Sequence, residues 1–228
     1  MPFDPSINAF IEKSRQYPGW IFEEEDASRY RGRWKELLGR DRLTVEIGPG
    51  NGWFFFEYLQ RNPDEGGIAI EKKFKRAVKT AEKLRRAKYR QSRVIRGRGE
   101  CLSAYFGTGE VDRYIIHFPT PWVKPHHKKR ILFSESFVDA LSKTLSPKGE
   151  IFLKSDHNEL MAIAAEQLVR RSFLLEINEP KFELSLGWGK NKIPMTGYEK
   201  KLSELGKSFF SLLAVRDYSD PSSLRSSE

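Results

Sequence analysis

Residues 45–52 have the sequence Val-Glu-Ile-Gly-Pro-Gly-Asn-Gly and lie between an apolar run and a helical pattern. The apolar run at 43–47 predicts a strand, and the pattern at 51–61 predicts a helix. Glycines at alternate positions let the backbone turn sharply between these two elements and let a ligand approach it closely. We therefore predict a ligand-binding loop formed by Gly48, Gly50 and Gly52.

A carboxylate stands at the end of the next predicted strand. That strand, 67–70, ends on Glu71, which lies 19 residues after Gly52. A carboxylate in this position can accept hydrogen bonds from both hydroxyls of a ribose, as in NAD-binding domains, whose glycine pattern is GxGxxG. Here the pattern is GxGxG, which methyltransferases with a nucleoside cofactor share. We predict a nucleoside cofactor of this kind; the alternatives are an NAD-binding domain, or a tight turn with Glu71 as a surface acid.

Strand and helix patterns alternate along the rest of the chain. Five further strand patterns lie at 93–96, 111–118, 150–154, 173–178 and 209–215. Alternation of this kind predicts an α/β fold, in which a mostly parallel, Rossmann-like sheet carries helices on both faces. Such folds bind ligands beyond the carboxyl ends of their strands.

The length of 228 residues fits one domain with an arm. We predict an N-terminal arm at 1–42, the α/β domain at 43–216 and a disordered, Ser-rich tail at 217–228. The first residues lack the pattern of a secretory signal, and no apolar run approaches the roughly 18 residues that span a bilayer. With one cysteine, Cys101, no internal disulfide is possible. We expect a cytoplasmic protein without a membrane partner.

The positive charge is concentrated in one segment. The net charge is +9, and 72–98 contains 13 Lys or Arg residues and one acid, Glu82. This segment therefore carries +12, and the remainder of the chain sums to −3. A concentrated positive zone favours an extended polyanion over a small acidic metabolite. The alternative is a helix whose charged faces are only solvated.

A basic loop follows the strand pattern at 111–118. Two prolines, Pro119 and Pro121, flank Thr120 and stiffen the loop at a strand end, where a substrate would meet a cofactor. Trp122 offers a stacking face. The loop has cations that can contact phosphates, Lys124, Lys128, Lys129 and Arg130. Adjacent histidines at 126 and 127 have poor spacing for zinc, so we predict no metal. We interpret the loop as an RNA contact, with a solvated basic loop as the alternative.

Four stretches, taken in order, resemble the tRNA (guanine-N7)-methyltransferase family. They are 46–52, 118–130, 154–156 and Thr196-Gly197-Tyr198-Glu199-Lys200-Lys201. The third stretch has Thr-Asp in most members of the family, so Asp156 matches and Ser155 is a mild change. The last has Thr-x-Phe-Glu-x-Arg, so Thr196 and Glu199 match and Tyr198 is conservative.

The resemblance implies a seven-stranded methyltransferase fold that uses S-adenosylmethionine and modifies tRNA. It implies that Glu46 and Glu71 lie at the cofactor. Near the target nucleotide it implies Lys124, Asp156, Thr196, Gly197, Tyr198 and Glu199. It leaves open whether the protein is a monomer or a homodimer.

Two positions depart from the family pattern. The family has Phe-Pro-Asp-Pro-Trp after its fourth strand, and this chain has Thr120 in place of the Asp. The family also has Asp-Ala after its third strand, where the acid faces the adenine; here 97–100 is Gly-Arg-Gly-Glu, and Glu100 is the candidate substitute. Thr120 is expected close to the transferred methyl group.

Guanine N7 carries an in-plane lone pair and needs no deprotonation, so positioning should dominate the reaction. Acids near the base would hold its N1 and amino donors and balance the charge left on the methylated ring. Asp156 and Glu199 are the candidates. The alternatives are a methyltransferase for another RNA position and an RNA-binding protein with a decayed methyltransferase fold.

Overall fold

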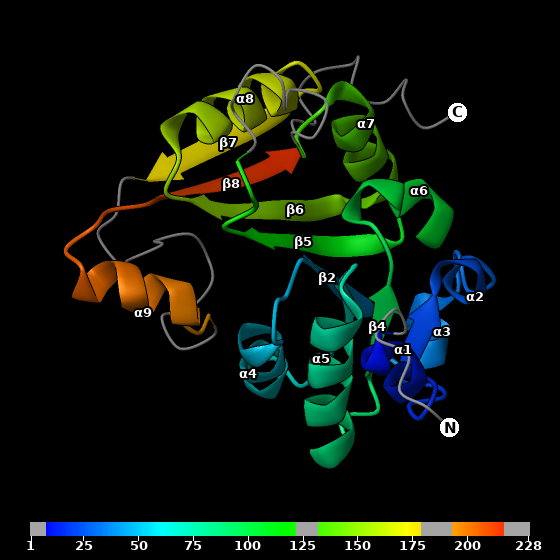
Figure 1. The fold of residues 1–228 in the computed structure, drawn as a ribbon. Coiled ribbons are helices and arrows are strands. Elements are labelled where there is room, and N and C mark those ends of the chain that lie inside the picture. The colour runs from blue at the N-terminus through cyan, green and yellow to red at the C-terminus, as the bar shows by residue number, and fades with distance from the viewer. Residues whose placement is uncertain (1–7, 122–131, 179–192, 217–228) are drawn as a thin grey trace.

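In the computed structural model, residues 8–121, 132–178 and 193–216 are described, and within them eight strands form one sheet (Figure 1). The strands are β1 (Ile21–Glu23), β2 (Arg42–Ile47), β3 (Glu65–Ile70), β4 (Ser92–Arg96), β5 (Val111–His117), β6 (Leu145–Ser155), β7 (Phe173–Asn178) and β8 (Phe210–Arg216). Their order across the sheet is β1-β4-β3-β2-β5-β6-β8-β7. Neighbours from β1 to β6 are parallel, and β8 is antiparallel to β6 and β7. The predicted α/β class and mostly parallel sheet are confirmed.

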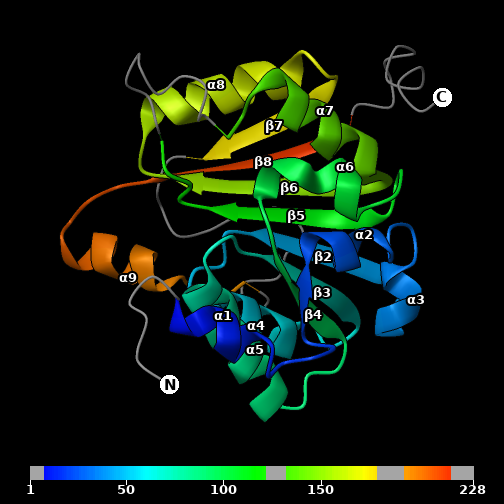
Figure 2. The same cartoon turned by 45° about the vertical axis from the view of Figure 1, so that its right-hand side comes forward.

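Helices cover both faces of the sheet, as predicted (Figure 2). One face carries α4 (Trp53–Arg61) and α5 (Phe74–Arg86), with α1 (Ala9–Ser14) against α5. The other carries α2 (Glu24–Ser28), α3 (Trp34–Leu38), α6 (Leu102–Tyr105), α7 (Glu135–Thr144) and α8 (Asn158–Val169). A short 3-10 helix, η1 (Gly99–Cys101), precedes α6, and α9 (Gly197–Glu204) precedes β8.

The two apolar cores follow from alternation along the strands. Ile115 packs in the core beneath α4 and α5, whereas its neighbour Ile116 packs in the core of the opposite face. Successive side chains of a strand point to opposite faces, so a buried parallel strand needs apolar residues throughout. Among the described residues, none of the helices has the length and apolar character that crossing a lipid bilayer requires.

Seven strands were predicted, and the sheet formed by the described residues has eight. The additional strand, β1, comes from the segment predicted as an arm and pairs in parallel with β4, Phe22 lying beside Ile95. It has three residues, of which only Phe22 is buried. A segment this short has no detectable alternation, and its strand conformation depends on hydrogen bonds to the edge of a sheet that forms elsewhere in the chain.

The order of the strands reverses between β2 and β5. From β2 the chain moves outward through β3 and β4, and it then returns to β5 on the other side of β2. Consecutive connections therefore leave the ends of β2 and β5 in opposite directions, and a crevice opens at their carboxyl ends. This topology determines where a ligand can bind.

A buried ionic network lies on the α4 side of the sheet. Arg113 on β5 donates to Glu65 Oε1 at 3.0 Å and to Glu150 Oε1 at 2.6 Å, and it also contacts the Tyr58 hydroxyl. The Thr44 hydroxyl donates to Glu65 Oε2 at 2.6 Å. The Arg113 side chain is 10% exposed, so its charge depends on these partners.

We predict that Arg113→Ala lowers the free energy of unfolding by about 3–5 kcal/mol, because it removes the guanidinium that donates hydrogen bonds to the buried Glu65 carboxylate and leaves only Arg42 Nε, at 3.8 Å from Oε1, paired with it among the described residues. Urea unfolding of the purified variant measures this change. Arg29→Ala is the matched control: the Arg29 side chain is 67% exposed and pairs with Glu25 and Asp26 on its own helix turn, so its loss should cost about 1 kcal/mol or less. Equal losses in the two variants would contradict the prediction.

Candidate functional site

A cleft of about 540 Å³ opens at the carboxyl ends of β2 and β5. Residues at the start of α4 and residues at the start of α9 both line it. Its lining consists of Glu46, Gly48, Pro49, Gly50, Asn51, Trp53, Phe54, Arg76, His117, Phe118, Pro119, Thr120, Pro121, Asp156, His157, Thr196, Gly197 and Tyr198. The structure therefore brings the predicted glycine loop together with residues from the three other stretches that carry the family resemblance.

The glycine loop has the backbone that its sequence predicts. Gly48, Gly50 and Gly52 have φ angles of +73°, +60° and +72°, a region that other residues enter at a cost. A Cβ on Gly48 or Gly50 would meet open space, so the backbone there is accessible from the cleft. A Cβ on Gly52 would collide with Thr80 of α5. The third glycine therefore allows close packing against α5, and the first two face the space for a ligand.

Glu71 lies directly beside this loop. The Gly48 amide donates to the Ile70 carbonyl at 2.9 Å, which places the end of β3 against the first glycine. The Glu71 carboxylate is 4% exposed and accepts from the Lys73 amide at 2.9 Å. Glu71 is not part of the cleft lining, although its charge is close enough to raise the pKa of Glu46.

Glu46 and His117 are buried side by side at the base of the cleft. Glu46 Oε1 lies 3.6 Å from His117 Nδ1, and the two side chains are 3% and 5% exposed. Glu46 Oε2 and both ring nitrogens of His117 have no hydrogen-bond partner among the described residues. Unpaired buried polar atoms are costly, so atoms of this kind that face a cleft indicate a ligand with polar groups.

Burial changes the proton affinity of both groups. Desolvation, followed by the charge of Glu71, raises the pKa of the Glu46 carboxyl to about 8. Desolvation, followed by the charge of Lys154, lowers the pKa of the His117 imidazole well below 6.5, so the ring is neutral at pH 7. His117 also packs edge-on against Phe54, with 4.2 Å between ring centroids. A positively charged ligand group would restore the ionised form of Glu46.

Lys154 and Glu199 form a buried ion pair behind the cleft. Lys154 Nζ donates to Glu199 Oε1 at 2.5 Å. Glu199 Oε2 accepts from the Thr196 amide at 2.7 Å, and the Thr196 hydroxyl accepts from the Glu199 amide at 3.0 Å, which completes a capping box at the start of α9. Glu199 is 2% exposed. Both of its oxygens therefore hold α9 in place.

Asp156 is the acid that faces the cleft on the α9 side. Its Oδ2 accepts from the Tyr198 hydroxyl at 3.0 Å, and Tyr198 is 44% exposed. Phe118 positions the loop on which Thr120 lies: it has a φ of +47°, its amide donates to the Lys154 carbonyl at 2.8 Å, and its ring lies 4.7 Å from that of Tyr198. A non-glycine residue with positive φ at a strand end is typical of a functional turn. Thr120 is exposed and lines the cleft.

Glu100, like Glu71, is a predicted cofactor residue that does not line this cleft. It is exposed on η1 and is not among the lining residues. The predicted RNA contacts Lys124, Lys128, Lys129 and Arg130 lie outside the described residues. In the part of the chain that the structure describes, no cluster of three or more His, Cys, Asp or Glu side chains could hold a metal ion.

The lining residues that sequence reasoning missed include His117, Arg76 and Trp53. Strand alternation could have indicated His117, because Ile115 and His117 lie on the same face of β5, and Ile115 is the register partner of Glu46 on β2. Arg76 was seen only as part of a basic segment, and Trp53 only as part of a helix pattern.

The fold and cleft define a Rossmann-like α/β methyltransferase. The structure titled as an antibiotic-related methyltransferase has this fold, with a TM-score of 0.57, 13% identity, and coverage of 80% of this chain and 92% of that one. Residues 40–212 match the family described as "Putative methyltransferase".

Two named relatives match over nearly the whole chain. The tRNA (guanine-N(7)-)-methyltransferase of Geobacillus kaustophilus is 32% identical, covering 90% of this chain and 93% of that protein. The protein of the same name in Geobacillus thermodenitrificans is 31% identical with the same coverage. The chain therefore belongs to the tRNA (guanine-N7)-methyltransferase family, and the resemblance noted in its sequence is confirmed.

The raised pKa of Glu46 predicts a pH-dependent stability. In the unfolded chain this carboxyl ionises near pH 4.5, whereas in the folded protein it ionises near pH 8. Between these values the folded protein holds a proton that the unfolded chain has lost, so stability falls as pH rises from 5 to 8.5. Glu46→Gln removes the titration. Without cofactor, the variant should match the wild type near pH 5 and exceed its melting temperature increasingly toward pH 8.5.

Differential scanning calorimetry across this pH range measures the effect. Glu57→Gln is the matched control, because Glu57 lies on the exposed side of α4 and pairs with Arg61 at the surface. A constant difference between Glu46→Gln and the wild type at every pH would contradict the buried, proton-retaining state of Glu46.

Proposed function

We propose that this protein transfers a methyl group from S-adenosylmethionine to N7 of a guanine in tRNA. The observation that carries the proposal is the cleft itself, in which the glycine loop and the unpaired oxygen of Glu46 face Asp156 and Tyr198. One side thus offers groups suited to a cationic nucleoside cofactor, and the other offers an acid and an aromatic hydroxyl suited to a base. The names of the relatives supply the target atom and the class of RNA.

The residues present fit S-adenosylmethionine. Glu46 would accept from its ammonium group, because Oε2 is buried at the base of the cleft and has no hydrogen-bond partner in the part of the chain that the structure describes. Glu71, at the end of β3, would accept from the ribose hydroxyls. The open space beside Gly48 and Gly50 leaves room for the cofactor against the loop backbone. Neutral His117 would present a nitrogen to the same region. Glu100, which is exposed on η1, is retained only as a hypothesis for the adenine end.

When bound, the cofactor would supply a methyl group activated by its sulfonium sulfur, for transfer to the lone pair of guanine N7. No general base is required, because the N7 lone pair is free at neutral pH. The main contribution of the chain is alignment of the base with the methyl carbon. Asp156 would accept from the donors of the guanine and balance the positive charge of the product ring.

Glu199 and Thr196 act indirectly in this proposal. Both oxygens of Glu199 bond Lys154 and the Thr196 amide, so these residues hold the first turn of α9. That turn presents Gly197 and Tyr198 to the cleft. The loss of either partner should therefore displace Tyr198, and with it the hydroxyl that donates to Asp156.

The RNA partner we propose is tRNA, held partly by phosphate contacts from Lys124, Lys128, Lys129 and Arg130. A cytoplasmic location is part of this proposal, and both a monomer and a homodimer are compatible with it. One observation favours a second function. Thr120 occupies the cleft where the family has an acid, as an RNA-binding protein that has lost catalysis would also show.

Glu71→Ala should weaken S-adenosylmethionine binding by tens-fold or more, measured by isothermal titration calorimetry. The change removes an acceptor for two ribose hydroxyls, and hydrogen bonds to a charged group contribute about 1.5–3 kcal/mol each. Glu71→Gln is the matched control for structure, because its amide oxygen can still accept from the Lys73 amide at the start of α5. An affinity of Glu71→Ala equal to that of the wild type would remove Glu71 from the cofactor site.

Wild-type protein incubated with S-adenosylmethionine and unmodified tRNA should form 7-methylguanosine, detected by nucleoside mass spectrometry. Asp156→Ala should reduce the rate at least tenfold, the equivalent of about 1.4 kcal/mol. Thr120→Asp should keep or raise the rate, because an ionised acceptor there would attract the developing cation more strongly than a hydroxyl does.

A different outcome would favour the second function. If the wild type binds both cofactor and tRNA but forms no 7-methylguanosine, and Thr120→Asp does form it, then Thr120 marks a lost activity.

A further inference from the structure

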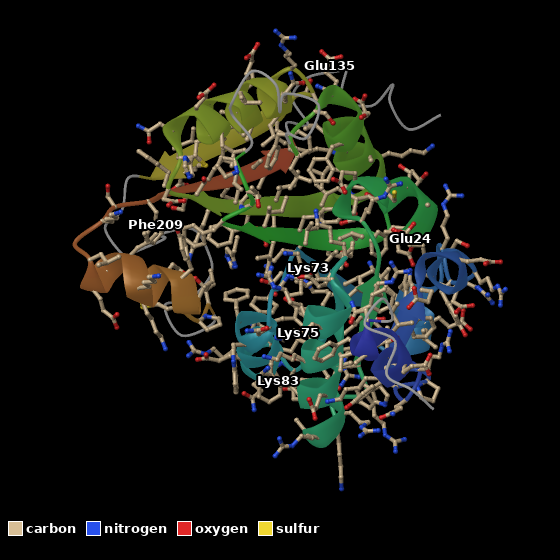
Figure 3. All side chains as sticks on the ribbon, viewed as in Figure 1. Glu24, Lys73, Lys75, Lys83, Glu135 and Phe209 are labelled. Atoms are coloured by element: carbon tan, nitrogen blue, oxygen red, sulfur yellow. The ribbon has the colours of Figure 1, made fainter. Side chains whose placement is uncertain are left out.

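One stripe of α5 faces the glycine loop and the start of α4. Arg76, Thr80 and Lys83 are spaced four and three residues apart and therefore lie on the same side of the helix. Each contacts the loop region differently: Arg76 lines the cleft, Thr80 packs against Gly52, and Lys83 Nζ donates to the Asn51 carbonyl at 2.7 Å. Figure 3 shows Lys83 on the side of α5 that faces α4.

The packing at Gly52 fixes the distance between the two helices. A Cβ on Gly52 would collide with the Thr80 side chain, which is fully buried. The Thr80 hydroxyl donates to the Arg76 carbonyl at 3.1 Å, so this side chain cannot turn away without losing a bond. The glycine loop and α5 are therefore held in a fixed position relative to each other. This packing also fixes the position of the residue that follows Gly52.

That residue, Trp53, is unusually exposed. It is the first residue of α4, it lines the cleft, and it is 67% exposed, more than any other large apolar side chain in the described ranges. Lys83 Nζ lies 4.1 Å from the centre of its ring. This cation–π contact orients the indole while most of its surface stays in solvent. An oriented, exposed indole at the mouth of a cleft is suited to stacking on a planar ligand.

The surroundings of Trp53 are positively charged. Arg76 and Lys79 are exposed, and neither has an ion-pair partner within the part of the chain that the structure describes. The one acid of α5, Glu82, has its Oε2 4.0 Å from Lys13 Nζ of α1. Arg76 and Lys79 therefore keep their charge free of ion pairs within the described ranges, which favours a polyanion as ligand.

We propose that Trp53 is a stacking platform for a nucleotide next to the target guanine, with Arg76 and Lys79 contacting the adjoining phosphates. This inference rests on the proposed function and deepens it. An enzyme that takes one base out of a stack exposes the bases on either side, and an aromatic ring can compensate for the lost stacking. The platform accepts any base, because every base has a π face.

The position of Trp53 distinguishes this ligand from the cofactor. Glu46 and His117 lie at the base of the cleft with side chains 3% and 5% exposed, where a small molecule would be enclosed. Trp53 stands at the rim, where a ligand that extends beyond the cleft passes. An RNA strand that enters the cleft with one base has a neighbour at the rim, and S-adenosylmethionine does not.

Four variants test the inference: Trp53→Ala, Trp53→Phe, Arg76→Ala and Lys143→Ala. The last is a charge control, because Lys143 is exposed on α7. Binding of unmodified tRNA is measured over a range of salt concentrations with saturating S-adenosylhomocysteine, and cofactor affinity is measured separately by calorimetry. Trp53→Ala should weaken tRNA binding about fivefold or more without changing the slope of log affinity against log salt. Trp53→Phe, which keeps a ring, should stay within about twofold of the wild type. Arg76→Ala should reduce the slope by somewhat under one unit, and Lys143→Ala should not change it.

Each contrary result has a separate meaning. If the wild type binds and methylates tRNA and Trp53→Ala binds it equally well, the platform is wrong and the proposed function stands. If Trp53→Ala weakens cofactor binding as much as tRNA binding, Trp53 belongs to the cofactor site and the inference is overturned. If the wild type does not bind tRNA at all, the proposed function itself fails.

Discussion

The reversal of strand order between β2 and β5 is the constraint on which the rest of this molecule depends. Because β3 and β4 lie on one side of β2 and β5 lies on the other, the connections separate and leave the carboxyl ends of the two central strands uncovered. The residues that follow these ends, the glycine loop after β2 and the turn at Phe118 after β5, can then face each other across one cleft. Helix α9, positioned by the buried pair of Lys154 and Glu199, closes its other side.

The same geometry creates the electrostatic character of the site. Glu46 and His117 point to the same face of the sheet as Ile115 and Phe152, so they are surrounded by the core beneath α4 and α5. Burial there keeps the imidazole neutral and favours the protonated carboxyl, and polar atoms of both side chains have no hydrogen-bond partner in the described ranges. These buried polar atoms lower the stability of the ligand-free protein, and a ligand that bonds to them would restore that stability. This is the arrangement expected of a preorganised binding site.

Much of this arrangement could be predicted from local sequence. The glycine loop, Glu46, Glu71 and Asp156 are each at a strand end, and strand ends are recognisable because the strands are continuous apolar runs followed by Gly, Pro or an acid. Features that depend on strand pairing or helix contacts could not be predicted in the same way. Strand β1 exists through its pairing with β4, and the two bonds that occupy Glu199 come from β6 and from a cap. In the sequence, Trp53 cannot be distinguished from a buried aromatic residue of a helix, because its exposure depends on how α4 packs against the rest of the fold.

The central claim is that the unpaired oxygen of Glu46 belongs to a cationic cofactor, and carbon-13 NMR of the Glu46 carboxyl, assigned with the Glu46→Gln variant, tests it most directly. Without ligand, the pKa of this carboxyl should lie at about 8. With saturating S-adenosylhomocysteine, which carries the same ammonium group, the carboxyl should stay ionised well below pH 7, because the bound cation stabilises its charged form. A Glu46 titration that is unchanged by saturating S-adenosylhomocysteine would contradict the account.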